Sequence, residues 1–256
     1  MDTETPNTET NTETQKPLLE RLFGVGAHFG FSKSRRHPTA SPYLFGNKQG
    51  VDIIDLEETI KSIDEAKEFL KEFGKAGKTV LFVGTKEETA QTIRDHAEAM
   101  EAPIVVNRWV GGMLTNFPEI KKRIQRLHDL TQKKESGELE RKYTKKERVI
   151  LGREFDKLVH NFDGIKDMDR LPQALVVVDP RHNSIAVSEA ISLKIPVVGI
   201  TNSDANMKQL TYPIVVNDGI RASVSLVLDE LVDAYQAGKA EYVVPTKPTK
   251  PKGRAR

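Results

Sequence analysis

The chain has 256 residues, 30% of them charged and 38% hydrophobic, so it can bury the core of one large domain. It contains no cysteine, which excludes disulfides, thiolate metal sites and a cysteine nucleophile. No apolar run approaches the roughly 20 residues of a membrane helix, and the acidic start does not have the pattern of a secretory signal. We therefore expect a soluble, cytoplasmic protein with no membrane partner.

The amino-terminal elements are expected to be a tail and a short helix. Residues 1–16 repeat Thr-Glu-Thr and almost lack apolar side chains, which predicts a disordered acidic tail. Pro17 then opens a short apolar helix, which the glycines at positions 24, 26 and 30 interrupt.

From Val51 onward, strand-like and helix-like patterns alternate. Asp55 is expected to cap the first long helix, which runs to about Phe73. Further helices are predicted at residues 86–100, 184–193 and 220–235. Strands are predicted at residues 51–54, 79–83, 104–106, 174–178, 196–200 and 213–216. This alternation predicts an α/β fold of three layers, with a doubly wound, mainly parallel sheet covered by helices on both faces.

One segment interrupts the alternation. Residues 117–161 contain no strand-like run, only two helical patterns separated by Ser136-Gly137. Two helices joined by a short linker lie antiparallel, so we predict an inserted α-helical hairpin. The predicted organisation is a single α/β domain at 17–116 and 162–237, the hairpin at 117–161, and a flexible basic tail at 238–256.

Basic charge is concentrated in patches that the net charge of +2 conceals. Residues 28–48 contain lysines and arginines but no acid. Residues 116–161 have 13 Lys/Arg against 8 Asp/Glu, and the chain from Lys239 has 6 against 1. This pattern is typical of a protein that contacts a polyanion. The alternative is that these runs are ordinary solvated helix faces.

Motifs for chemistry are weak. Gly77-Lys78-Thr79 ends a helix and starts a strand, which is the wrong context for a phosphate-binding loop. No two of the six histidines are separated by three or four residues, so no helix-borne metal pair is present. Asp179, Thr201, Asn202 and Asp204 follow strands, where α/β enzymes bind ligands, although such residues more often cap helices and make turns. We predict no catalytic residue, no metal and no cofactor.

The most informative run is residues 107–116, Asn-Arg-Trp-Val-Gly-Gly-Met-Leu-Thr-Asn, which holds the only tryptophan. Arg108 offers a fixed cation, and Trp109 offers an aromatic face for packing or stacking. The glycine pair Gly111 and Gly112 allows a sharp turn or a close backbone approach. We predict Trp109, Gly111 and Gly112 to be a structural anchor at the base of the hairpin.

This run resembles the signature of the small-subunit ribosomal protein S-two family. Segments 27–30, 81–86, 164–172, 201–204 and 217–221 resemble other motifs of the family, in family order, between about residues 18 and 237. The sequence departs from the family pattern at Phe31, Ile200 and Ala205 and within residues 217–219.

The resemblance implies a structural component of the small ribosomal subunit. It further implies that the hairpin is a coiled-coil arm, that the partners are small-subunit ribosomal RNA and other small-subunit proteins, including S-one in bacteria, and that the protein is located in the ribosome. Lys and Arg would displace counterions from the phosphate backbone. The candidate RNA-binding residues are His28, Lys33, Arg35, Arg36, His37, Lys48, Arg108, Lys121, Lys122, Arg123, Arg126, Lys145, Lys146 and Arg148.

Two other functions remain open from the residues themselves. A sugar-phosphate or nucleotide-binding enzyme on the same α/β fold would need a ligand cleft at the strand ends. A protein-interaction scaffold that used the hairpin as a coiled coil would need a sustained heptad seam, which the few apolar positions do not supply.

Overall fold

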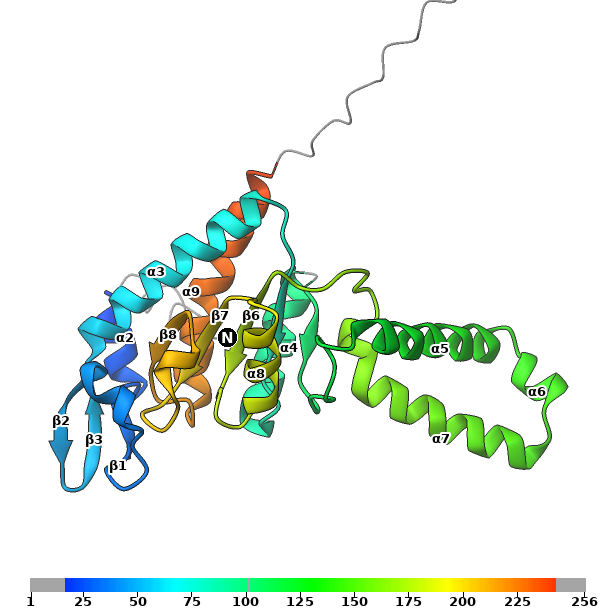
Figure 1. The fold of residues 1–256 in the computed structure, drawn as a ribbon, viewed down its shortest axis with the longest axis horizontal. Coiled ribbons are helices and arrows are strands. Elements are labelled where there is room, and N and C mark those ends of the chain that lie inside the picture. Colours follow the sequence, from blue (N-terminus) through cyan, green and yellow to red (C-terminus); the bar gives the residue numbers. More distant parts are fainter. Residues whose placement is uncertain (1–16, 101, 243–256) are drawn as a thin grey trace, which may run out of the picture.

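The computed structural model describes residues 17–100 and 102–242 (Figure 1). The predictions for residues 1–16 and for most of the basic tail therefore lie outside the described residues. The α/β class is confirmed, because a five-stranded parallel sheet flanked by helices forms the body of the molecule.

The central sheet has the order β5-β4-β6-β7-β8, and all neighbouring strands are parallel. Its strands are β4 (Val80–Val83), β5 (Ile104–Val105), β6 (Ala174–Val178), β7 (Val197–Thr201) and β8 (Tyr212–Val215). All five residues of β6 and of β7 are buried. The chain runs from β4 outward to β5 and then back across to β6. The strand order therefore reverses between β4 and β6, which is the point where such sheets place polar sites.

Two apolar clusters cover the two faces of this sheet. On β4, Leu81 and Val83 belong to the cluster that holds Trp109 and α8 (Ser184–Ser192), together with the apolar sides of α5 (Phe117–Glu135) and α7 (Lys145–Phe162). Val80 and Phe82 belong to the other cluster, which includes α2 (Leu18–Gly24), α3 (Leu56–Lys75), α4 (Glu87–Met100) and α9 (Arg221–Ala240). Successive residues of a strand point to opposite faces, so the continuously apolar strands are buried on both sides.

Helices α3 and α9 lie along each other over much of their length (Figure 1). Glycine makes this approach possible, since a Cβ atom on Gly238 would lie 2.1 Å from the carbonyl oxygen of Lys71. As expected, Asp55 caps α3, and its Oδ1 accepts from the N–H of Glu57 at 3.0 Å. α9 ends at Ala240, five residues beyond the expected end, so residues 238–240 belong to a helix and not to a tail. Among the described residues, no helix has both the length and the apolar character needed to cross a membrane.

The amino-terminal part differs from the prediction. Val51–Ile54 is a strand (β3), but it is not part of the parallel sheet. It pairs antiparallel with β1 (Phe29–Ser32) and β2 (Leu44–Lys48) in a separate three-stranded sheet. A short 3-10 helix, η1 (Pro38–Tyr43), connects β1 and β2. The sequence did not predict β1 and β2, because both are short, contain a glycine and have no fully buried residue.

Residues 117–162 extend from the body (Figure 1). The chain leaves along α5 (Phe117–Glu135), turns through α6 (Glu138–Lys142) and returns along α7 (Lys145–Phe162) beside α5. Gly137, with φ +67°, makes the turn before α6. The 3-10 helices η2 (Asp163–Ile165) and η3 (Met207–Gln209) lie in the body. The apolar stripe of α5 includes Leu130, which is buried.

Candidate nucleic-acid interface

The acid-free segment 28–48 forms part of the small sheet and is held against the carboxyl end of β7. The backbone N–H of Phe31 donates to Asn202 Oδ1 at 3.1 Å and lies 3.2 Å from Ser203 Oγ. The N–H of His37 donates to the carbonyl of Ser203 at 2.8 Å. The segment is therefore a fixed surface and not a free loop.

The cations of this segment fall into two groups. Lys33 and Lys48 are exposed, and neither has an ion-pair partner among the described residues. Arg36 lies 3.5 Å from the buried carboxylate of Asp52, and Arg35 lies 3.6 Å from Asp204 with its guanidinium over the Phe31 ring. Because the arginines also hold the fold, the lysines are the groups most available to an external anion.

The two candidate histidines have local structural partners. The His28 ring stacks on Phe23, with centroids 4.4 Å apart, and contacts Phe29. Burial lowers the pKa of His28, which favours the neutral ring. His37 caps η1, because its Nδ1 accepts from the N–H of Thr39 at 3.3 Å. Both side chains are therefore partly buried and engaged within the fold.

The second basic surface lies along α5 and α7. Arg126 forms two 2.9 Å hydrogen bonds with Glu154, which link α5 to α7. This hydrogen-bonded pairing raises the pKa of Arg126 and lowers that of Glu154. Lys122 lies 2.6 Å from Glu119, and Lys121 lies 3.8 Å from Asp169. The exposed cations without an ion-pair partner among the described residues include Arg123, Lys145, Lys146 and Arg148.

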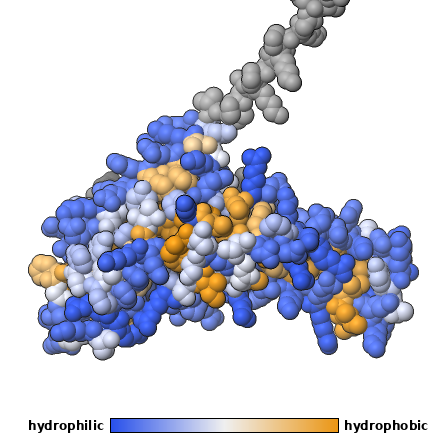
Figure 2. All heavy atoms as spheres, in the orientation of Figure 1, coloured by the Kyte–Doolittle hydropathy of each residue, from blue (hydrophilic) through white to orange (hydrophobic). Residues whose placement is uncertain are grey.

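Figure 2 shows how these surfaces are distributed. Hydrophilic residues cover the small-sheet end and most of the projecting α5–α7 end, while apolar residues gather between them over α8. On α8 and at its carboxyl end, the side chains of Ile185, Ile191 and Leu193 are exposed. The two ends of this face are therefore mostly polar, apart from a small apolar area on the projecting end, and its centre is apolar.

The run 107–116 connects the body to α5. Arg108 is exposed, whereas Trp109 is only 7% exposed and packs in the core. Gly112 has φ +86°, a conformation that favours glycine. A Cβ atom at Gly111 would meet nothing within 4 Å, so space does not require glycine there.

Glu189 on α8 holds this run in place. Its carboxylate accepts five hydrogen bonds, from Trp109 Nε1, the backbone N–H groups of Gly112, Leu114 and Thr115, and the Thr115 hydroxyl, all at 2.8–3.1 Å. Burial raises the pKa of Glu189, but these hydrogen bonds outweigh it and the net pKa is lowered. The sequence analysis did not identify Glu189. Its position could have indicated it, because it is an acidic residue on the same helix face as the buried Ala186, Val187 and Ala190.

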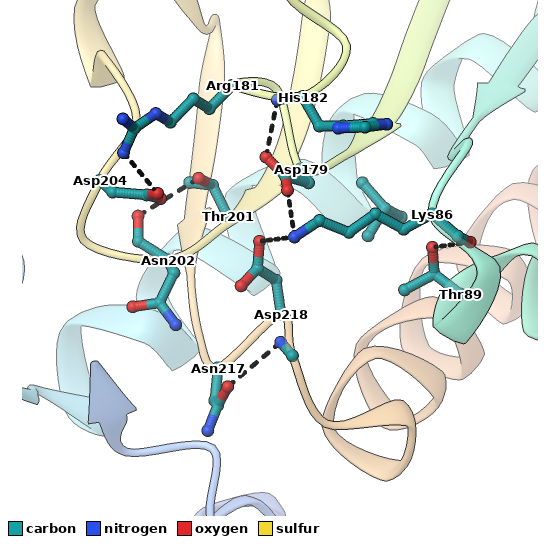
Figure 3. Close-up of polar contacts among 12 residues, drawn as sticks. Lys86, Thr89, Asp179, Arg181, His182, Thr201, Asn202, Asp204, Asn217 and Asp218 are labelled. Carbon is teal, nitrogen blue, oxygen red and sulfur yellow. Dashed lines mark hydrogen bonds and ion pairs between the residues drawn. The ribbon is translucent and has the colours of Figure 1, made fainter. Parts of the chain in front are cut away.

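A polar cluster lies where the strands of the central sheet end (Figure 3). Lys86 forms a close ion pair with Asp179, and its Nζ lies 3.9 Å from Asp218. Asp179 has φ +54°, and its carboxylate also accepts from the N–H of His182 at 2.9 Å. The sequence identified Asp179 but missed Lys86 and Asp218, although both follow predicted strands.

Burial and neighbouring charges set the pKa values of Asp218 and Lys86 in this cluster. Burial, followed by the charge of Asp179, raises the pKa of Asp218 to about 7. Both of its carboxylate oxygens are buried and have no hydrogen-bond partner among the described residues. Burial works against the charge of Lys86, but its carboxylate neighbours raise its pKa overall, so the amine stays protonated. The described residues also contain no group of three or more His, Cys, Asp or Glu that could hold a metal ion.

The fold and these surfaces are those of an α/β protein with basic exterior patches and a buried polar cluster at its strand ends. A family model described as ribosomal protein S2 matches residues 22–238. Small ribosomal subunit protein uS2 of Dictyoglomus thermophilum is 42% identical over 222 residues, covering 87% of this chain and 90% of its own length. The uS2 protein of Salinibacter ruber is 41% identical, covering 87% of this chain and 69% of its own. The uS2 protein of Petrotoga mobilis is 40% identical, with 86% and 76% covered.

The chain therefore belongs to the ribosomal protein S2 family, as the motifs of the sequence indicated. This is a family of ribosomal proteins and not a family of enzymes.

Proposed function

We propose that this protein is a structural component of the small ribosomal subunit and binds ribosomal RNA there. Family membership supports the structural role. RNA binding is proposed from one observation. Segment 28–48 and the α5–α7 segment have exposed cations that have no ion-pair partner among the described residues. Such side chains lose little on meeting phosphate and release the counterions that RNA holds.

The α5–α7 segment acts in this proposal as an arm inserted into a single α/β domain. The Arg126–Glu154 pair and the shared apolar stripe hold the two helices together. Their outward cations can then meet RNA at a distance from the body, while Lys33 and Lys48 meet it at the other end (Figure 1). Neighbouring small-subunit proteins, with S-one among them, are the proposed protein partners.

The experiment uses two charge-reversal variants of the full chain. We expect Lys33→Glu with Lys48→Glu, and separately Lys145→Glu with Lys146→Glu, to weaken binding to purified small-subunit RNA and to flatten its salt dependence. Arg170→Glu with Lys194→Glu makes the same change of charge at exposed positions elsewhere on the body. Equal loss in this control would show that net charge alone matters. Unchanged binding in both test variants would refute the proposal.

We further propose that the strand-end cluster serves the fold and that the protein is not an enzyme. Lys86 is held between carboxylates, and the Asp218 carboxyl group is buried, so no substrate could reach it without an opening of the fold. The purified chain should therefore not convert ATP, GTP or common sugar phosphates. Turnover of one of these that disappears in Lys86→Met, with the melting temperature retained, would support the enzyme alternative instead.

A further inference from the structure

A cleft of about 340 Å³ lies between the η1 side of the small sheet and the start of α8. Its walls come from two parts of the chain, residues 35–38 and residues 180–209. Three arginines line it, Arg35, Arg36 and Arg181, together with His37. Arg181 follows β6 and was not among the cations that the sequence analysis singled out.

One carboxylate orders two of these guanidinium groups. Arg181 Nη1 donates to Asp204 Oδ2 at 2.8 Å, and Arg35 Nη2 lies 3.6 Å from the same oxygen (Figure 3 shows the Arg181 contact). The Arg181 and Arg35 side chains are nevertheless 54% and 56% exposed, whereas that of Asp204 is buried. A guanidinium has five N–H donors, so each arginine keeps donors for a second anion while Asp204 fixes its position.

The start of α8 adds to the positive character of the cleft. Ser184, its first residue, is exposed and lines the cleft. The Asn183 side chain does not cap the helix, because its amide donates to the carbonyls of Val178 and Asp179 and its oxygen accepts from Thr85. The nine-residue helix therefore begins without a side-chain cap at the cleft wall, where its dipole favours an anion. The helix dipole adds a small attraction for an anion to the larger one from the three arginines.

The charges around the cleft suit a monoanion. Arg35, Arg36 and Arg181 contribute three positive charges, and Asp204 and Asp52, which pair with them, contribute two negative ones. One positive charge remains. Guanidinium groups also match the two non-bridging oxygens of a phosphate diester.

We propose that this cleft seats one phosphodiester group of ribosomal RNA, with Arg181 and Arg35 as its ligands and Asp204 as the residue that positions them. This inference rests on the proposed RNA binding. RNA is favoured over an acidic protein because the cleft continues the surface of segment 28–48, where exposed Lys33 stands two residues from Arg35. On the surface of segment 28–48 the lysines offer only single positive charges. The cleft adds paired guanidinium groups, whose N–H donors match the oxygens of a phosphate.

The test measures binding of the full chain to purified small-subunit RNA over a range of salt concentrations. We expect Arg181→Gln to weaken binding about tenfold and to lower the slope of log K against log salt by about 0.7–0.9, the value for one lost phosphate contact. Arg181→Lys keeps the positive charge but loses the planar guanidinium group with its paired N–H donors. Its affinity for RNA should therefore lie between those of the parent and Arg181→Gln. Arg170→Gln removes an exposed arginine before β6, at the opposite end of that strand, and should change neither quantity.

Each other outcome has a distinct meaning. If Arg181→Gln keeps the parent's melting temperature and its RNA binding, while the Lys33 and Lys48 variant loses binding, the cleft proposal is overturned and the proposed function stands. If the parent chain does not bind the RNA at all, the proposed function fails first. If inorganic phosphate raises the melting temperature of the parent but not of Arg181→Gln, with RNA binding equal, the cleft is a site for free anions. If Arg181→Gln loses only capture of an acidic ribosomal protein, a protein is the occupant, and the RNA assignment is overturned.

Discussion

Two buried carboxylates, one on α8 and one at the strand ends of the central sheet, titrate in opposite directions. Glu189 accepts five hydrogen bonds, and its pKa is lowered despite its burial. Among the described residues, Asp218 makes no hydrogen bond of good geometry on either oxygen and has only a weak contact with the Asn202 side chain, and its pKa is raised to about 7. Burial alone therefore does not decide the charge of a group. The donors that replace water decide it.

The comparison also separates two ways to use a buried acid. The charged carboxylate of Glu189 accepts hydrogen bonds from three backbone N–H groups and so holds the turn that joins the body to α5. Around Asp218 the nearest cation, Lys86, is already in close contact with Asp179. The first acid should stabilise the fold at neutral pH, and the second should destabilise it there.

The largest effect is expected from Glu189→Ala. The change leaves five donors without their acceptor, three of them backbone N–H groups, and we expect the free energy of unfolding to fall by about 4 kcal/mol at pH 7. Urea denaturation gives this value. Glu119→Ala removes an exposed acid from α5 and should cost no more than about 0.5 kcal/mol.

The pH dependence sharpens this prediction. The folded pKa of Glu189 is lowered, so its contribution is present above its unfolded pKa and is lost as the pH falls through the folded pKa. The difference between parent and Glu189→Ala should therefore shrink in acid. A difference that stays constant into strong acid would mean that packing, and not the charge, holds the turn.

Asp218→Asn should have the opposite sign. The folded pKa of about 7 lies above the model-compound value of 3.8, so the folded state binds the proton more tightly. Stability from this group is full below about pH 4 and declines as the pH rises to about 7. A shift of three units corresponds to about 4 kcal/mol, and coupling to Lys86 and Asp179 reduces our expected gain for Asp218→Asn to about 2 kcal/mol at pH 8.

Thermal and urea unfolding between pH 5 and 8 measure this gain. The control is Asp233→Asn, which changes an exposed residue of α9, the helix that follows Asp218. Its stability should depend on pH in the same way as that of the parent. The contradicting result is a parent protein whose stability does not decline relative to that of Asp218→Asn as the pH rises from 5 to 8. It would mean that Asp218 ionises in the folded state at no cost in stability, because Lys86 compensates its charge.

The sequence predicted the parts of the fold that depend on local pattern. The strands of the parallel sheet are short apolar runs, and α3 begins at the Asp55 cap that its sequence indicates. The burial of Trp109 followed from its place between a strand and a glycine pair. In α7 the helical pattern alone does not decide between Val149 and Leu151, and in the structure Leu151 packs inward while Val149 is exposed.

The remainder depends on contacts between distant residues. Glu189 is 80 residues from Trp109 in the sequence. Three of the hydrogen-bond donors to Glu189 are backbone N–H groups, which every residue except proline has, so the sequence gives no sign of these contacts. β1 and β2 are short, carry Gly30 and Gly46, and have no fully buried residue, so their pairing with β3 leaves no run of buried apolar residues. Arg181 and Arg35 meet only because segment 28–48 packs against the end of β7.

The smallest predicted effect comes from Trp109→Phe. Phenylalanine keeps most of the buried ring but removes the Nε1 donor that lies 3.1 Å from Glu189 Oε1, an oxygen that the N–H of Gly112 also contacts at 2.8 Å. We expect a loss of about 1 kcal/mol, because one hydrogen bond is removed and the carboxylate keeps the other four. RNA binding should not change, since Trp109 is only 7% exposed.

A double-mutant cycle with Glu189→Gln locates this effect. Glutamine keeps the shape of Glu189 but removes its charge, so the Trp109 donor then faces a weaker acceptor or another donor. If the indole acts through Glu189, Trp109→Phe should cost less in the Glu189→Gln background than in the parent, with a coupling energy of at least about 0.5 kcal/mol. Additive losses would instead assign the Trp109 contribution to packing in the apolar cluster it shares with Leu81 and Val83. In that case the buried charge would organise the backbone of the turn without help from the ring.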